Sequence, residues 1–419
     1  MQLLDLSAVL VGLIALLAVA NARLLKMPST VGVTIGGLVV SLAIVGLARL
    51  QVPLALDAVQ TVHAIDFDAV VFLGVLSFLL FAGALGLDSH ELWGLRWPVF
   101  VFALLSTAIS TAVVGGLVHL LLEAFGQPVA LVYCLLFGAL ISPTDPVAVL
   151  GMLKHAQVPH RIETIVAGES LFNDGVGVVA FTVLAAVATS GSGGGHTVEL
   201  SAPAVGLFFL REAVGGLVLG VVIGYVGLLL IRVVADYVTE VLVSLGVVIT
   251  LTAVALHLTV SAPLAAVAAG LLVGSLTDRT PSTLTSREHF EGFWHLVDEL
   301  LNVFLFALLA FQVVTLRFGA QPVALGLIAI PLVLAVRTIS VQFPMMILRR
   351  FRVFDPYTRR LMIWGGLRGA LGVAMAFTLP DGAPRELFLV MTYAVVVFSI
   401  VVQGLTVGRL ARRASAAAQ

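Results

Sequence analysis

The chain has 419 residues, of which 60% are hydrophobic and only 11% are charged, and its mean hydropathy is +1.14. A soluble domain carries about 25% charged residues, so this composition excludes an ordinary soluble protein and predicts an all-α polytopic membrane protein. The formal net charge of −1 carries little information by itself, and the single cysteine, Cys134, excludes an intramolecular disulfide.

Thirteen stretches of the sequence are long and apolar enough to be predicted as membrane spans, since a transmembrane helix needs about 20 mostly apolar residues. In chain order, the predicted spans are 6–22, 28–48, 68–87, 97–122, 128–153, 163–188, 205–231, 237–258, 260–276, 293–316, 321–348, 361–380 and 386–408. No basic residue precedes the first stretch, so we expect a retained span and not a cleaved signal peptide.

The basic residues predict how these spans are oriented. With the N-terminus outside, sixteen of the 22 Lys and Arg residues fall in inner loops or in the tail, and three fall in outer segments. The remaining three, Arg211, Arg337 and Arg368, lie within spans. Because Lys and Arg accumulate on the cytoplasmic side, this bias supports thirteen spans, an outer N-terminus and a cytoplasmic C-terminus.

A polar, proline-containing segment interrupts the fifth predicted span. It reads Ser142-Pro143-Thr144-Asp145-Pro146. A carboxylate at bilayer depth costs about 2.5 kcal/mol or more, so Asp145 is expected only in a protein interior or a wet cavity. Pro143 and Pro146 remove backbone donors and disfavour helix at the residue before each of them. A broken helix at this depth is tolerated where it lines a cavity, which predicts an ion site in a transporter.

The sixth predicted span carries a second polar segment, Glu169-Ser170-Leu171-Phe172-Asn173-Asp174-Gly175. Residues four apart share a face of a helix, so Ser170 and Asp174 lie on one face. Glu169 and Asn173 lie on the neighbouring face for the same reason. The first face is expected to offer oxygens to a cation, and the second is expected to meet a structural partner.

Together the two segments predict a binding site for a hard monovalent cation such as Na⁺. Ser170 and Asp174 supply a hydroxyl and a carboxylate, and Thr144 and Asp145 add further oxygens, including carbonyls that the prolines leave free. The sequence has no Cys or His cluster here, which argues against a transition-metal site. A carboxylate that carries either a cation or a proton is sufficient for exchange of one against the other.

The second half of the chain shows a faint repeat of the first. Pro28 to Val39 in the second span resembles Pro263 to Val273 in the ninth, and spans seven apart run in opposite directions, so the repeat would be inverted. The partner of span five is span twelve, which carries Gly365-Gly366-Leu367-Arg368-Gly369 and is also expected to be interrupted. Arg368 is expected either to line the path to the ion or to bind carbonyls of a broken helix.

A further arginine, Arg337, lies deep in span eleven and needs an anionic partner, because an unpaired guanidinium is prohibitive in the membrane. We expect Glu169 to be this partner, since Asp145 and Asp174 are assigned to the ion.

Four features of the chain resemble one family: Thr-Asp-Pro in span five, Glu-Ser-Leu-Phe-Asn-Asp-Gly in span six, the arginine in span eleven and Gly-Gly-Leu-Arg-Gly in span twelve. The family that they resemble is that of the NhaP/NHE-type monovalent cation–proton antiporters. Span ten, with Phe293-Trp294 and Val297 to Asn302, resembles the same family. The resemblance implies one membrane transport domain, 1–413, with a short cytoplasmic tail, 414–419. It implies a transport core of spans 4–6 and 11–13 and a dimerisation part of spans 1–3 and 8–10, in a homodimer of the cell membrane.

The resemblance also implies roles for individual residues in exchange of Na⁺ or Li⁺ for H⁺. Asp174 would carry the cation or the proton, with Asp145, Ser170 and the Thr144 carbonyl as further Na⁺ ligands. No cofactor and no nucleic-acid partner is expected; the partners would be the transported ions and the bilayer.

Other residues would support this site. Asn173 and the Glu169–Arg337 pair would be structural, and an Asn-Asp pair in place of Asp-Asp implies electroneutral one-for-one exchange. The chain departs from many relatives in having Gln312 where they have a glutamate at the end of span ten, and in lacking a glutamate in 79–84. A gate built on those two acids is not expected here.

Two other classes of protein fit the sequence less well. An intramembrane enzyme with paired aspartates would carry Gly-x-Gly-Asp or Asp-Asp-x-x-Asp, and neither motif is present. An ion channel would carry a continuous filter or repeated pore loops, whereas here the charged residues converge on one mid-membrane cluster. The sequence leaves exchange of K⁺ for H⁺ open as the alternative to exchange of Na⁺.

Overall fold

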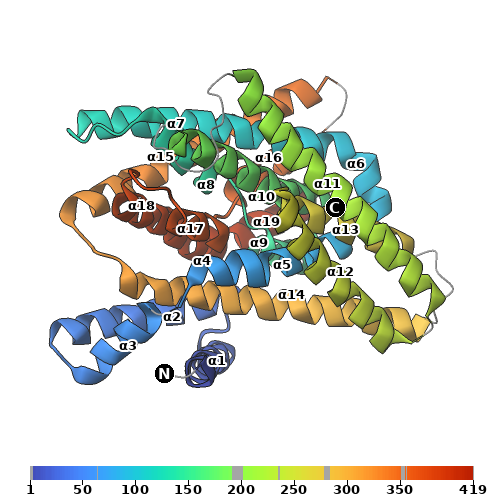
Figure 1. Cartoon of the computed structure of the whole chain (residues 1–419), viewed down its shortest axis with the longest axis horizontal. Helices are drawn as coiled ribbons and strands as arrows, with labels where there is room; N and C mark the ends of the chain where they lie inside the picture. Colours follow the sequence, from blue (N-terminus) through green and yellow to red (C-terminus); the bar gives the residue numbers. More distant parts are fainter. Residues whose placement is uncertain are drawn as a thin grey trace.

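A computed structural model describes residues 3–63, 65–190, 202–234, 236–277, 284–350, 354 and 356–418. Within these ranges the chain is almost entirely helical, which confirms the all-α fold class (Figure 1). The α-helices of the first half are α1 (Leu3–Ala20), α2 (Ser29–Arg49), α3 (Pro53–His63), α4 (Phe67–Ala69), α5 (Leu76–Leu85), α6 (Ser89–Val101), α7 (Thr107–Ala124), α8 (Leu131–Ile141), α9 (Val147–His155) and α10 (His160–Thr189). Those of the second half are α11 (Ala202–Val233), α12 (Tyr237–Leu258), α13 (Ala262–Thr277), α14 (Leu284–Gln312), α15 (Ala320–Leu348), α16 (Pro356–Trp364), α17 (Ala370–Phe377), α18 (Arg385–Phe398) and α19 (Gly404–Ala418).

Short segments with wider or tighter turns join several of these helices. The π-helical segments are η1 (Asn21–Leu25), η2 (Val70–Val75), η3 (Phe102–Ser106) and η5 (Ser399–Gln403), and η4 (Val313–Thr315) is a 3-10 turn. A π-helical turn inside a longer helix changes which face the following residues present, and such turns are frequent at functional sites.

Ten helices of the described chain are long and apolar enough to cross a membrane. The three other predicted spans, five, nine and twelve, correspond to shorter helices: α8 with α9, α13, and α16 with α17. The count of thirteen spans and the inverted repeat therefore stay predictions. Arg279 and Arg352, which contributed to the predicted orientation, lie outside the described residues.

Helix α3 was not predicted from the sequence. It lies between predicted spans two and three, is only 11 residues long, and carries polar residues such as Asp57 and Gln60 among its apolar ones. A run of this length is too short for a span. Pro53 at its start is compatible with a helix, because the first turn has no partner for the missing N–H group. Helix α19 continues to Ala418, so it includes most of the predicted tail, 414–419, whose cytoplasmic location stays a prediction.

Both predicted interruptions are present. The fifth span consists of α8 and α9, separated by a non-helical stretch that contains Thr144 and Asp145, and the twelfth consists of α16 and α17, separated around Gly366. Asp145 and Leu367 pair there in an isolated antiparallel bridge. The two broken helices therefore cross at their non-helical stretches.

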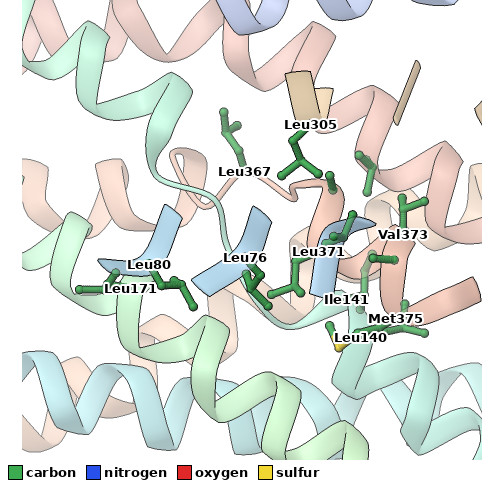
Figure 2. Close-up of a cluster of buried hydrophobic side chains, with 14 of the residues drawn as sticks. Leu76, Leu80, Leu140, Ile141, Leu171, Leu305, Leu367, Leu371, Val373 and Met375 are labelled. Atoms are coloured by element: carbon green, nitrogen blue, oxygen red, sulfur yellow. The ribbon is translucent and has the colours of Figure 1, made fainter. Parts of the chain in front are cut away.

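Long helices surround this crossing. Helix α14 lies along α2 and α5, and α13 packs on both α5 and α11 (Figure 1). On the other side α7 packs on α8 and α15, and α15 packs on α18. Buried apolar side chains of α5, α8, α10 and α17 gather around the crossing, as Figure 2 shows for Leu76, Leu140, Leu171 and Leu371. The polar residues of the two breaks are thus enclosed by apolar packing on several sides.

Candidate functional site

The backbone at the crossing is held by hydrogen bonds between the two broken helices. The Asp145 N–H donates to the Leu367 carbonyl at 2.8 Å. The Arg368 guanidinium donates to the carbonyls of Ser142 and Pro143, the latter at 2.9 Å. These carbonyls belong to the end of α8, where the last C=O groups of a helix have no partner within it. Of the two positions expected for Arg368, the structure shows the one in which it binds carbonyls of a broken helix.

A cluster of polar side chains joins this crossing to α10. The Thr144 N–H donates to Asn173 Oδ1 at 3.2 Å, and Asn173 Nδ2 donates to Thr144 Oγ1 at 2.8 Å. Thr144 Oγ1 also lies 3.1 Å from Ser170 Oγ. All three residues are buried, so each of these hydrogen bonds satisfies a group that water does not reach. The cluster fixes the position of the Thr144–Asp145 peptide relative to α10.

Asp145 and Asp174 are the two acidic residues beside this cluster, and both are only partly buried. Asp145 Oδ1 accepts the Val147 N–H at 2.9 Å, at the start of α9. Asp174, one turn after Ser170, has no hydrogen-bond or ion-pair partner among the described residues. The two carboxylates interact electrostatically with each other. Asp174 therefore presents free oxygens beside buried hydroxyls and a second carboxylate.

The absence of a side chain at Gly369 allows this approach of the two breaks. A Cβ atom built on Gly369 would lie 2.6 Å from Asp145 Oδ2 and 2.8 Å from Asp145 Cβ. Both distances are shorter than real Cβ contacts, so a larger residue would displace Asp145. The glycine is needed for close packing at this point.

Glu169 and Arg337 form a bidentate ion pair between α10 and α15, with Nη1–Oε1 at 2.8 Å and Nη2–Oε2 at 2.9 Å. Both side chains are almost fully buried, at 2% and 4% exposure. Arg337 Nη2 also donates to the Met362 carbonyl at 3.0 Å, and Asn173 Nδ2 donates to Glu169 Oε1 at 3.1 Å. The pair thus links α10, α15 and the end of α16.

Three further residues contribute to the site although no sequence motif predicted them. Ser106, the last residue of η3, accepts from Arg337 Nη1 at 3.3 Å. Ser399, in η5, accepts the Arg368 N–H at 2.9 Å, and Gln403 Nε2 donates to the Trp364 carbonyl at 3.0 Å. The sequence signal for these residues is a polar side chain inside an apolar run. This signal is weak for a serine and stronger for Gln403.

The arrangement as a whole offers oxygen atoms and a free carboxylate at a broken-helix crossing. Carboxylates, hydroxyls and carbonyls are the ligands that hard cations prefer. The guanidinium groups of Arg337 and Arg368 are engaged elsewhere, with Glu169 and with the α8 carbonyls. The free oxygens can therefore bind a small cation, or a proton in its place.

Comparisons with known proteins agree on one family. A family model described as "Sodium/hydrogen exchanger, transmembrane" matches residues 12–413. The Na⁺/H⁺ antiporter NhaP of Pseudomonas aeruginosa is 41% identical over 416 residues, which cover 98% of this chain and 97% of that protein. The Na⁺/H⁺ antiporter NhaH of Halobacillus dabanensis is 32% identical over 408 residues, covering 96% and 95%. In structure, the sodium proton antiporter MjNhaP1 of Methanocaldococcus jannaschii matches with a TM-score of 0.76 at 17% identity, over 99% of this chain and 100% of that one.

Proposed function

The chain belongs to the sodium/hydrogen exchanger family, and from this premise we propose that it is a secondary active antiporter that exchanges Na⁺ for H⁺ across a membrane. It is a multi-pass membrane protein of a transporter family, which decides against the intramembrane enzyme and the ion channel. The observation that carries the proposal is the free carboxylate of Asp174 beside the Thr144–Ser170 hydroxyl pair at the crossing of two broken helices.

In the proposed mechanism, Asp174 alternately carries the cation and the proton. The bound Na⁺ or Li⁺ would exchange its hydration shell for oxygens of the protein. These are the carboxylate oxygens of Asp174 and Asp145, the Ser170 hydroxyl and the Thr144 carbonyl. The Thr144 hydroxyl is already engaged with Ser170 and Asn173, which supports its carbonyl as the ligand. A proton on Asp174 removes the charge that holds the cation. The site therefore changes its exposure from one side of the membrane to the other with either a cation or a proton bound.

The neutral residue before Asp174 supports an electroneutral cycle. Asn173 cannot titrate, and its amide is committed to Thr144 and Glu169. Of these two positions, only Asp174 would exchange a bound cation for a bound proton during the cycle. One Na⁺ is therefore proposed to move against one H⁺, without net transfer of charge.

Three charged residues are proposed to support the site and not to bind the ion. Glu169 and Arg337 neutralise each other in a buried, bidentate pair. Arg368 replaces the missing donors at the end of α8. Because alternating access moves one part of a transporter against another, rigid contacts of this kind keep the two breaks together during the movement.

We also propose a division into two parts and a homodimer. Helices α6 to α10 with α15 to α19 would form the transport core, and α1 to α5 with α12 to α14 would form the dimerisation part. The packing of α14 on α2 and α5, and of α7 on α8 and α15, supports this division. The proposed location is the cell membrane, with the N-terminus outside and the C-terminus in the cytoplasm.

Proteoliposomes that contain a pH-sensitive dye test the function. Addition of Na⁺ or Li⁺ to vesicles of wild-type protein should move protons across the membrane. The Asp174→Asn variant should lose this exchange, because the amide side chain neither takes up a proton nor carries a negative charge. Residual exchange above about a tenth of the wild-type rate would remove Asp174 from the mechanism.

Two comparisons make this experiment specific. Asp57→Asn, which makes the same change at an exposed position of α3, should leave exchange unchanged. K⁺ should give a smaller response than Na⁺. A response to K⁺ that exceeds the response to Na⁺ and Li⁺ would favour exchange of K⁺ for H⁺ instead.

A further inference from the structure

We propose that the cavity between α9 and α19 binds the phosphate group of an anionic phospholipid. The cavity has a volume of about 350 Å³ and is lined by Met152, Ala156, Leu405, Gly408, Arg409 and Arg412. This volume is within the range of about 300–1,000 Å³ that ligand sites occupy. It lies apart from the crossing that carries Asp145 and Asp174, and none of its residues has a role in the proposed ion exchange.

Two arginines supply the charge in this cavity. Arg409 and Arg412 are three residues apart on α19, so they share one face of the helix. Both are exposed, and among the described residues neither has a hydrogen-bond or ion-pair partner. A guanidinium group matches the geometry of phosphate oxygens with two parallel N–H donors. Two unpaired guanidinium groups at one cavity therefore form an acceptor site for a phosphate.

The surrounding helices reinforce this charge. Helix α19 packs against α9 and α16. These three helices carry six Lys and Arg residues and no Asp or Glu: Lys154, Arg359, Arg360, Arg409, Arg412 and Arg413. Nothing on these three helices neutralises the two arginines of the cavity, and an anion near it would meet attraction from several directions.

The depth of the cavity favours a lipid over a free anion. The apolar run from Leu387 to Leu405 is already about as long as the hydrocarbon core requires, which places Arg409 and Arg412 at the level of the headgroups. Met152 and Leu405 provide an apolar wall beside the guanidinium groups, which suits the glycerol and the first methylene groups of a lipid. Basic pockets between membrane helices at this depth are a known mode of headgroup recognition.

Phosphatidylglycerol is the probe for the experiment. It is added to the purified protein in detergent, the melting temperature is recorded as a function of its concentration, and native mass spectrometry counts the lipids retained. Phosphatidylglycerol should raise the melting temperature, because a ligand that binds only the folded state stabilises it. Phosphatidylcholine, which has a phosphate but no net charge, and inorganic phosphate should each have a much weaker effect.

Variants of this cavity decide where the lipid binds. Arg409→Gln and Arg412→Gln should each weaken the apparent affinity about tenfold, since each removes a charge-assisted contact. Gly408→Leu should weaken it as well, by filling the cavity without a change of charge. Arg413→Gln is the matched control, because it removes one charge from the same helix at a position that does not line the cavity.

The assignment is overturned by any of three results. Equal weakening by Arg413→Gln would show diffuse attraction to a basic surface and not a site. Full retention of affinity in Gly408→Leu, with an unchanged elution profile, would place the lipid outside the cavity. An equal rise of the melting temperature with inorganic phosphate would assign the site to the free anion and not to a lipid.

Discussion

At the scale of single residues, the site separates charges that are neutralised from a charge that is free. Arg337 donates to both oxygens of Glu169, and Arg368 donates to two backbone carbonyls. Asp174 has neither kind of partner in the described chain. Arg368 acts on Asp174 electrostatically but forms no hydrogen bond or ion pair with it in the described chain, so the oxygens of Asp174 stay available to a cation. This separation is the reason why the two arginines can lie near the site without blocking it.

The Glu169–Arg337 pair is predicted to be essential for stability. Removal of one partner of a buried ion pair costs about 3–5 kcal/mol, because the other charge stays buried without compensation. Arg337→Ala and Glu169→Ala should each lower the melting temperature in detergent. The double variant should lose less than the sum of the two single losses, since residues in contact are not additive.

The exposed pair Arg317–Glu386 provides the control. Its side chains are 84% and 70% exposed and lie 3.3 Å apart, and exposed pairs of this kind contribute about 1 kcal/mol or less. Its two single variants should change the melting temperature little. Strictly additive losses for Glu169→Ala and Arg337→Ala would contradict the coupling that the structure implies.

At the scale of elements, the sequence predicted the helices that apolar length alone determines. Span eight was predicted at 237–258, and the structure has α12 at Tyr237–Leu258. The two breaks were also predictable, because Pro143 and Pro146 act locally on the backbone. Helix α3 was not, because a short run with polar residues resembles a loop. Local chemistry thus accounts for where helices run and break.

The contacts of the breaks could not be predicted in the same way. Ser106 and Ser399 reach the arginines from π-helical segments, and the position of such a segment depends on packing against the rest of the fold. The pairing of Glu169 with Arg337 was predictable only because a buried charge requires a partner and few acidic residues were available. The bond from Arg368 to the carbonyls of α8 was one of two alternatives that the sequence left open.

Close packing between α11 and α13 gives a prediction for these elements. A Cβ atom on Gly220 of α11 would collide with the Ala265 carbonyl of α13. Gly220→Ala should therefore force the helices apart and lower the stability by about 1–3 kcal/mol, measured as a lower melting temperature in detergent. The small residue is needed because helices in membranes associate through close van der Waals contact.

Gly206, on the same helix, is the matched control for this change. No atom lies within 4 Å of a Cβ atom built there. Gly206→Ala should be neutral or stabilising by about 0.5–1 kcal/mol, because alanine loses less backbone entropy than glycine in a helix. If Gly220→Ala proved as stable as Gly206→Ala, the contact between α11 and α13 would be looser than the structure shows.

At the scale of the whole molecule, the fold brings two interrupted helices from distant parts of the sequence to one crossing. Asp145 and Leu367 are bonded there although more than two hundred residues separate them. Interrupted helices in corresponding positions of two halves are typical of transporters that alternate access around a fixed site. The residues at the crossing then determine which ions the molecule exchanges and whether net charge moves across the membrane in each cycle.

The proposed stoichiometry of one Na⁺ for one H⁺ is a property of the whole transport cycle. Asn173 stands where a second titrating carboxylate could stand, and its amide is held by Thr144 and Glu169. We therefore expect that the rate of Na⁺-driven proton movement in proteoliposomes does not depend on the membrane potential. In the measurement, valinomycin and K⁺ gradients set a series of potentials, and a pH-sensitive dye reports the rate after addition of Na⁺.

Asn173→Asp tests the physical reason behind this expectation. The variant adds a carboxylate beside Asp174, so two carboxylates could take up and release protons in one transport cycle. Where the variant folds and transports, its rate should depend on the imposed potential while that of the wild type does not. A wild-type rate that follows the potential would show that net charge moves in each cycle. It would refute the electroneutral mechanism but leave the role of Asp174 as the exchanging carboxylate intact.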